Sequence, residues 1–140
     1  MIITNCYQVK LIKNLLEHKL LVQALTVLWT GLVAYLCLAT PTGLPSVSLF
    51  KFDKLGHFAF HLGITVMWFL FWKTTFKNEN KFALLKAFLF SFFFGIVIEI
   101  MQEFLTDDRS GDIEDVFANS IGALIAVVFI YVVHKLFPKI

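Results

Sequence analysis

Polar side chains that can do chemistry gather in one stretch of an otherwise apolar chain. The stretch runs from Ile98 to Gly122, between the apolar runs Ala87–Ile98 and Ile121–Val133. Its seven acids and the only arginine of the chain are Glu99, Glu103, Asp107, Asp108, Asp112, Glu114, Asp115 and Arg109. If the apolar flanks lie in a bilayer, several of these groups lie in or near hydrocarbon, where ionisable residues are costly and therefore usually functional. We therefore place the candidate site here.

The chemistry best suited to these residue types is proton transfer beside a bound anionic group. A histidine and a carboxyl group form a general acid–base pair that works near neutral pH, and His57 and Glu99 are the candidates. The predicted catalytic residues are His57, Glu99, Gln102 and Asp115. The predicted ligand-binding residues include Lys54, Arg109 and Asn119.

Arg109 has two interpretations. In the first, it pairs with Asp107 or Asp108 in an exposed loop, where an ion pair contributes under about 1 kcal/mol. In the second, it is an anion clamp at the membrane surface, because a guanidinium fork matches carboxylate and phosphate groups. The partial positive charge at the N-terminus of a helix that begins near Ile113 adds to this attraction, and acids in the first turn of that helix partly cancel it.

The composition places the chain among membrane proteins. Of its 140 residues, 59% are hydrophobic, and the mean hydropathy is +0.79. This is more apolar surface than the core of a soluble domain of that length can bury. The net charge is only +2 and no basic run is interleaved with aromatic residues, so we exclude nucleic acid as a partner.

Four apolar runs are long enough to cross a bilayer as helices. They cover residues 20–39, 55–72, 82–105 and 113–137. Residues 1–18 carry apolar positions at helical spacing with polar residues opposite, which predicts a short helix lying at the membrane interface. The predicted fold is therefore an all-α, polytopic membrane protein with four transmembrane helices and an N-terminal interfacial helix, in a single domain over residues 1–140.

The lysines indicate the orientation, because positively charged loops stay on the cytoplasmic side. With both termini inside, nine lysines lie on the inner side, against two lysines and Arg109 on the outer side. The outer side then carries the loop 41–54, which prolines keep out of helix, and the polar loop 106–112. We predict a multi-pass protein with both termini in the cytoplasm.

Each of the last three spans carries one polar stripe at helical spacing. The stripes are His57 and His61 on the second span, Glu99, Gln102 and Glu103 on the third, and Asp112, Asp115 and Asn119 on the fourth, followed by Gly122. A rise of about 1.5 Å per residue puts Glu99 and His61 at the same depth, roughly 10 Å below the outer face. It puts His57 about one turn nearer that face. Because lipid offers no hydrogen-bond partner, we expect the stripes to face one another in a polar pocket open to the outer leaflet.

Three motifs in a fixed order resemble the VanZ-like family of small bacterial membrane proteins. They are D-K-x-x-H-F at Asp53–Phe58, G-x-x-x-E-x-x-Q at Gly95–Gln102 and R-x5-D-x3-N-x2-G at Arg109–Gly122. The resemblance implies that the family's polar positions fall on Asp53, Lys54, His57, Glu99, Gln102, Arg109, Asp115, Asn119 and Gly122. It thereby adds Asp53 to the predicted ligand-binding residues. It also implies a place in the bacterial inner membrane and a link to resistance to the glycopeptide antibiotic teicoplanin, without defining a biochemical activity.

One position departs from the family pattern, and it bears on metal binding. His57, His61 and Glu99 together would supply three zinc ligands. The family more often has an aromatic residue at position 61, which implies that His61 is dispensable. We therefore expect no metal and no other cofactor.

Two functions fit the predicted pocket. In the first, the protein binds or acts on an envelope lipid or lipid-linked precursor: Arg109 and Lys54 hold an anionic headgroup, and His57 and Glu99 transfer a proton. In the second, it is a non-enzymatic accessory protein that shields the envelope from a lipoglycopeptide. The expected partners are the lipid bilayer and one of these ligands, and an oligomer is allowed.

A third interpretation leaves the polar groups as hydrogen-bonding contacts that hold the helices together. Such bonds contribute about 0.6–2 kcal/mol each in membranes. Inserting one ionisable group at mid-bilayer costs about 2.5–3.5 kcal/mol. Serine and glycine would hold the helices at a lower cost, so we favour a functional site.

Overall fold

The computed structural model describes residues 19–39, 46–105 and 111–137. This part of the chain forms no strand and four helices, α2 (Lys19–Leu38), α3 (Ser46–Phe76), α4 (Asn80–Leu105) and α5 (Ile113–Leu136). Each contains a segment long and apolar enough to cross a membrane. The predicted all-α fold with four spanning helices is confirmed, and the chain is a multi-pass membrane protein. The interfacial helix predicted for residues 1–18 lies outside the described residues.

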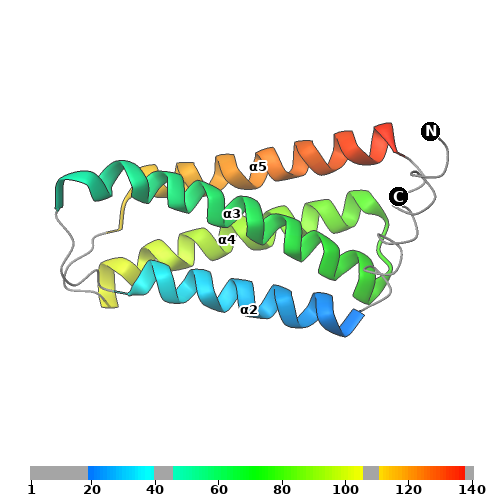
Figure 1. The fold of residues 1–140 in the computed structure, drawn as a ribbon, viewed down its shortest axis with the longest axis horizontal. Helices are drawn as coiled ribbons and strands as arrows, with labels where there is room; N and C mark the ends of the chain where they lie inside the picture. The colour runs from blue at the N-terminus through cyan, green and yellow to red at the C-terminus, as the bar shows by residue number, and fades with distance from the viewer. Residues whose placement is uncertain (1–18, 40–45, 106–110, 138–140) are drawn as a thin grey trace, which may run out of the picture.

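The helices form an antiparallel bundle in which α3 is the central helix (Figure 1). α3 contacts α2, α4 and α5, and its interface with α5 is the most extensive; α4 also contacts α2 and α5. α3 begins, α4 ends and α5 begins at one end of the bundle, on the left in Figure 1, which we call the polar end. The polar stripes of these three helices therefore lie at the same end.

α3 is longer than predicted and takes up much of the segment predicted to be a loop. It begins at Ser46, whereas the sequence predicted a span from residue 55 after a loop over 41–54. The prediction treated Pro45 as a helix breaker. The predicted loop is wrong over residues 46–54, which contain no proline or glycine and are helical, whereas the part of α3 that could cross a membrane, Asp53–Phe76, begins within two residues of the predicted span.

The start of α5 has the capping residues that its sequence indicates. Asp112 is the N-cap, and its side chain accepts a hydrogen bond from the Glu114 backbone N–H at 2.8 Å. Glu114 and Asp115 add negative charge to the first turn, and His134 and Lys135 lie in the last turn. Both ends thus complement the helix dipole, which fixes where α5 begins at the polar end.

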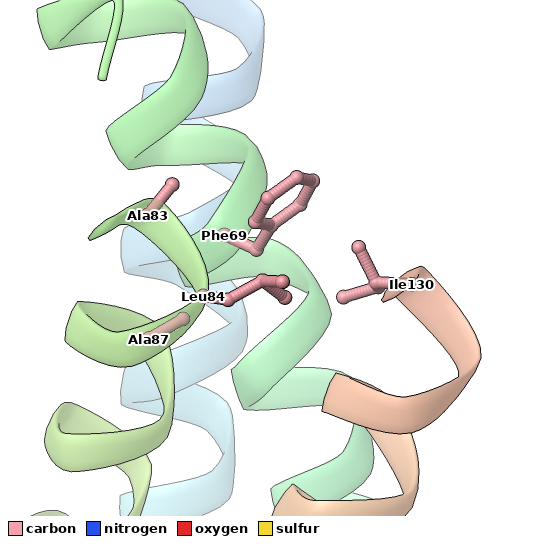
Figure 2. Close-up of a cluster of buried hydrophobic side chains, with 5 residues drawn as sticks. All are labelled: Phe69, Ala83, Leu84, Ala87 and Ile130. Atoms are coloured by element: carbon pink, nitrogen blue, oxygen red, sulfur yellow. The ribbon is translucent and has the colours of Figure 1, made fainter. Parts of the chain in front are cut away.

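Two hydrophobic clusters hold the bundle together. The first, away from the polar end, consists of Phe69 of α3, Ala83, Leu84 and Ala87 of α4 and Ile130 of α5 (Figure 2). The second joins α2, α3 and α4 through Val33, Cys37, Ile64 and Ile98. The alanines of α4 let its neighbours approach closely, as small residues do in membrane helix pairs.

Large apolar side chains also cover the outside of the bundle. Leu20 on α2, Phe93 on α4 and Phe129 on α5 are 80%, 58% and 63% exposed. Apolar surface of this extent is unusual for a soluble monomer, whereas lipid tails solvate it. The apolar exterior therefore agrees with a membrane location.

Candidate functional site

Four polar side chains from three helices are buried together at the polar end. They are His57 of α3, Glu99 of α4, and Asp115 and Asn119 of α5, and we call them the polar cluster. None is more than 6% exposed. They meet because Glu99 lies near the end of α4, Asp115 lies in the first turn of α5, and α3 crosses both helices at this level.

His57 is the centre of the polar cluster, because both of its ring nitrogens face polar atoms. Nδ1 lies 3.2 Å from Asn119 Oδ1 and 3.5 Å from Glu99 Oε1. Nε2 lies 3.8 Å from Asp115 Oδ2 and 3.9 Å from Asp53 Oδ1. Five of the eight predicted site residues are thus within one set of contacts.

Glu99 connects the polar cluster to the start of α5. Its Oε2 accepts a hydrogen bond from the Asp112 backbone N–H at 3.2 Å, and Glu103 accepts one from the Gly111 N–H at 2.9 Å. Glu99 Oε1 is buried and accepts no hydrogen bond from the described residues. A Cβ on Gly111 would lie 2.8 Å from the Glu99 carbonyl oxygen, so glycine lets the chain pass this close to α4.

Lys54 is ion-paired with the acids at the start of α5. Its Nζ lies 2.7 Å from Glu114 Oε2 and 3.0 Å from Asp112 Oδ2. It lies 3.5 Å from Asp115 Oδ1. The Glu114 backbone N–H and the Lys54 ammonium hold the pKa of the Asp112 carboxyl below its usual value. An anionic ligand at Lys54 would therefore have to displace a carboxylate.

Gln102 makes a contact that the sequence prediction did not anticipate. Its Nε2 donates a hydrogen bond at 2.9 Å to the carbonyl oxygen of Cys37 on α2. That carbonyl belongs to the last turn of α2, where carbonyl groups have no partner within their own helix. Gln102 therefore fastens α4 to the end of α2.

His61 lies deeper in the bundle than Glu99, so the predicted equal depth is wrong. His61 Nδ1 is 2.9 Å from Ser91 Oγ, and Ser91 precedes Glu99 by eight residues, about 12 Å along α4. His57 is the histidine at the level of Glu99. The depth count started from Lys54 on one helix and from Lys86 on the other, so it did not include the offset between α3 and α4 along the bundle.

Two glycines let the helices approach at the level of the polar cluster. A Cβ on Gly122 would lie 2.2 Å from the Phe58 carbonyl oxygen, so the backbones of α3 and α5 touch there. A Cβ on Gly95 would lie 3.0 Å from both Asn119 Nδ2 and His61 Cε1. A larger residue at either position would push apart the helices that carry the cluster.

Two residues of this region were not among the predicted site residues, although the sequence predicted Asp112 as a cap of the fourth span. Asp112 caps α5, binds Lys54 and gives its N–H to Glu99. Its position directly before an apolar run, with acids following, is a helix-start signal. Ser91 binds His61 and lies four residues before Gly95, which lies four before Glu99, so its position on the same helix face was visible in the spacing.

Arg109 lies outside the described residues. The described part of the site has two chemical capacities. An imidazole can pass a proton between groups at its two nitrogens, and the nitrogens of His57 face Glu99 on one side and Asp115 on the other. Carboxylates and imidazole nitrogens are also ligands for divalent cations.

The comparison with known proteins identifies the family of the chain. The VanZ/LLP1 family model matches residues 5–134, from before α2 into the last turn of α5. No curated protein and no solved structure matches the chain. The match extends well beyond the three motifs at residues 53–122 that carry the resemblance in the sequence. The chain therefore belongs to the VanZ/LLP1 family.

Proposed function

We propose that this protein binds the headgroup of an envelope lipid or lipid-linked precursor at the polar cluster, on the outer side of the bacterial inner membrane. The observation that carries the proposal is the burial of His57, Glu99 and Asp115 in mutual contact at one end of four membrane-spanning helices. In this proposal the protein contributes to glycopeptide resistance because it keeps the bound lipid away from the antibiotic or alters that lipid chemically.

Contacts between α2 and α3 illustrate helix packing by neutral polar groups. Thr26 Oγ1 donates to the Met67 carbonyl oxygen at 3.2 Å, and Trp68 Nε1 donates to Thr30 Oγ1 at 3.1 Å. Such bonds contribute about 0.6–2 kcal/mol without any ionisable group. The polar cluster instead places two carboxyl groups and an imidazole where each is costly. A ligand-binding role accounts for that cost, and helix packing does not.

The charges of the described site set a condition on the ligand. Five carboxylates surround one ammonium group and one imidazole: Asp53, Glu99, Asp112, Glu114 and Asp115 lie around Lys54 and His57. An anionic headgroup therefore needs more positive charge than Lys54 provides. In this proposal Arg109 supplies part of it, because guanidinium groups bind phosphate in a bidentate manner.

Lipid co-purification tests the proposal. Protein extracted with its surrounding lipid is expected to retain a phosphate-bearing lipid or lipid-linked precursor, enriched over the bulk membrane by mass spectrometry. Lys54→Gln is expected to lower that enrichment at least severalfold, because it removes the ammonium group of the site. Lys81→Gln is the matched control, since Lys81 pairs with Glu79 at the opposite end of the bundle.

The same experiment separates an enzyme from an accessory protein. A chemically altered lipid that appears only when His57 and Glu99 are intact would indicate turnover. Retention of an unaltered ligand would indicate the shielding role. If the lipids that co-purify with the wild type match those of the bulk membrane, the proposal is rejected both for an enzyme and for an accessory protein.

Topology is the second prediction, because the proposed ligand lies on the outer side. A reporter fused after Asn78, in the turn between α3 and α4, is expected to read cytoplasmic. A reporter inserted near Ser46, at the start of α3, is expected to read external, since the lysine distribution favours this orientation. Reversed signals would put the polar cluster on the cytoplasmic side and replace the proposed substrate with an inner-leaflet lipid.

A further inference from the structure

Three side chains at the polar end have the donor set and the spacing of a cation site. They are Asp53 and His57 of α3 and Asp115 of α5, and their ligand atoms lie within 4.8 Å of one another. His57 Nε2 is 3.9 Å from Asp53 Oδ1 and 3.8 Å from Asp115 Oδ2. These distances are too long for hydrogen bonds, so direct hydrogen bonding does not explain why the three groups face one another.

The second nitrogen of His57 determines what Nε2 presents to the carboxylates. Nδ1 faces Asn119 Oδ1 at 3.2 Å and Glu99 Oε1 at 3.5 Å, and both oxygens are acceptors. In the tautomer that gives these two oxygens a donor, Nδ1 carries the proton and Nε2 of the neutral ring turns its lone pair toward Asp53 and Asp115. Histidines that bind metals have this arrangement, in which the other ring N–H is held by a carboxylate or carbonyl oxygen.

The Asp115 carboxylate is a second sign, because its ion pair with Lys54 is long and shared. Asp115 is 6% exposed, and its Oδ1 accepts no hydrogen bond from the described residues. Its nearest cation, Lys54 Nζ, is 3.5 Å away and lies closer to Asp112 and Glu114. A buried carboxylate is stabilised by a paired or coordinated positive charge, and Lys54 is shared among three acids.

We infer that Asp53, His57 and Asp115 bind one divalent transition-metal cation of the zinc class. An imidazole nitrogen with two carboxylate oxygens suits zinc or a similar metal, whereas calcium and magnesium favour oxygen ligands alone. Zn–N and Zn–O distances of about 2.0–2.2 Å place tetrahedral ligand atoms roughly 3.4 Å apart. The observed separations are longer, 3.8 and 3.9 Å from His57 Nε2 and up to 4.8 Å within the set, so both carboxylates must move closer to Nε2 and to each other when the cation binds.

This site differs from the zinc set considered from the sequence. There, His61 was the second histidine, and it is instead bound to Ser91 deeper in the bundle. The three ligands bring two negative charges, so a divalent cation neutralises them. If the proposed function is correct, the cation also supplies positive charge for the phosphate of a headgroup, which the surrounding carboxylates would otherwise repel.

Metal binding by the protein alone tests the inference. The tag-free full chain in detergent, stripped with a chelator, is dialysed against Zn²⁺ and its metal content is measured by mass spectrometry. The wild type is expected to bind one zinc per chain. Asp53→Asn, His57→Asn and Asp115→Asn are each expected to weaken binding about tenfold or more, as the loss of even an outer partner does.

Two control variants and a second readout keep the test decisive. Glu79→Gln changes an acid at the opposite end of the bundle, and His61→Phe removes the other histidine of α3; both are expected to bind zinc like the wild type. Zinc is also expected to raise the unfolding temperature of the wild type but not that of Asp53→Asn. Because the Asp53 side chain is partly exposed, its replacement by asparagine is expected to leave the fold intact, so a loss of zinc binding in this variant reports on the site. No zinc in the wild type, or equal zinc in Asp53→Asn, overturns the inference whatever lipid the protein binds.

Discussion

Glu99→Gln is expected to abolish function while leaving membrane insertion and the fold intact. Glutamine keeps the size of the side chain and an oxygen that can accept the Asp112 N–H, which now lies 3.2 Å from Oε2. It removes the negative charge 3.5 Å from His57 Nδ1. A hydrogen bond to a charged group contributes about 1.5–3 kcal/mol, which corresponds to a loss of roughly ten- to a hundredfold in ligand binding.

The measurement is survival under glycopeptide and envelope stress, with variants compared at equal membrane abundance. If Glu99 only held helices together, an amide would serve as well or better, because it avoids burying a carboxylate. Wild-type survival of Glu99→Gln would therefore exclude a role for its charge. Its unfolding temperature in detergent shows whether a loss of survival reflects the site or the fold.

The two histidines of α3 serve as paired controls for this experiment. His57→Phe is expected to lose function, because it removes the contacts to Asn119, Glu99 and Asp115. His61→Phe is expected to keep function, because the polar contact of His61 is to Ser91, deeper in the bundle than the polar cluster. An inactive His61→Phe of normal stability would bring His61 into the site.

Gly122→Ala is expected to destabilise the bundle more than other single-methyl additions. The new Cβ would lie 2.2 Å from the Phe58 carbonyl oxygen, and backbone atoms at a helix crossing cannot rotate away. The α3–α5 interface is the most extensive in the bundle, so separating these helices loosens most of its packing. Overpacking typically costs about 1–3 kcal/mol, which lowers the unfolding temperature by on the order of 5–10 °C.

Gly31→Ala is the matched control for that substitution. Gly31 is also in a membrane-spanning helix, but a Cβ there would meet no atom within 4 Å. Because alanine is the better helix former by about 1 kcal/mol, this variant is expected to unfold at the same temperature or slightly higher. Equal unfolding temperatures for Gly122→Ala and the wild type would mean that α3 and α5 do not touch through their backbones.

The sequence alone determined the number of spans, their approximate bounds and the end of the bundle that carries the polar residues. Four apolar runs of sufficient length leave few alternatives in a bilayer, because every backbone group must be satisfied within a helix. Helical spacing also placed His57, Glu99, Asp115 and Asn119 on inward faces, since three or four residues make one turn whatever surrounds the helix. Local periodicity was enough for these features.

Only the tertiary structure decided which polar residues meet. The height of α3 relative to α4 put His57 beside Glu99 and His61 beside Ser91, and the approach of α2 gave Gln102 the Cys37 carbonyl oxygen. The position of α3 beside α5 likewise placed Lys54 against Asp112 and Glu114. Residue spacing fixes positions along one helix but not the offset between two, which depends on close contacts such as Gly122 against Phe58.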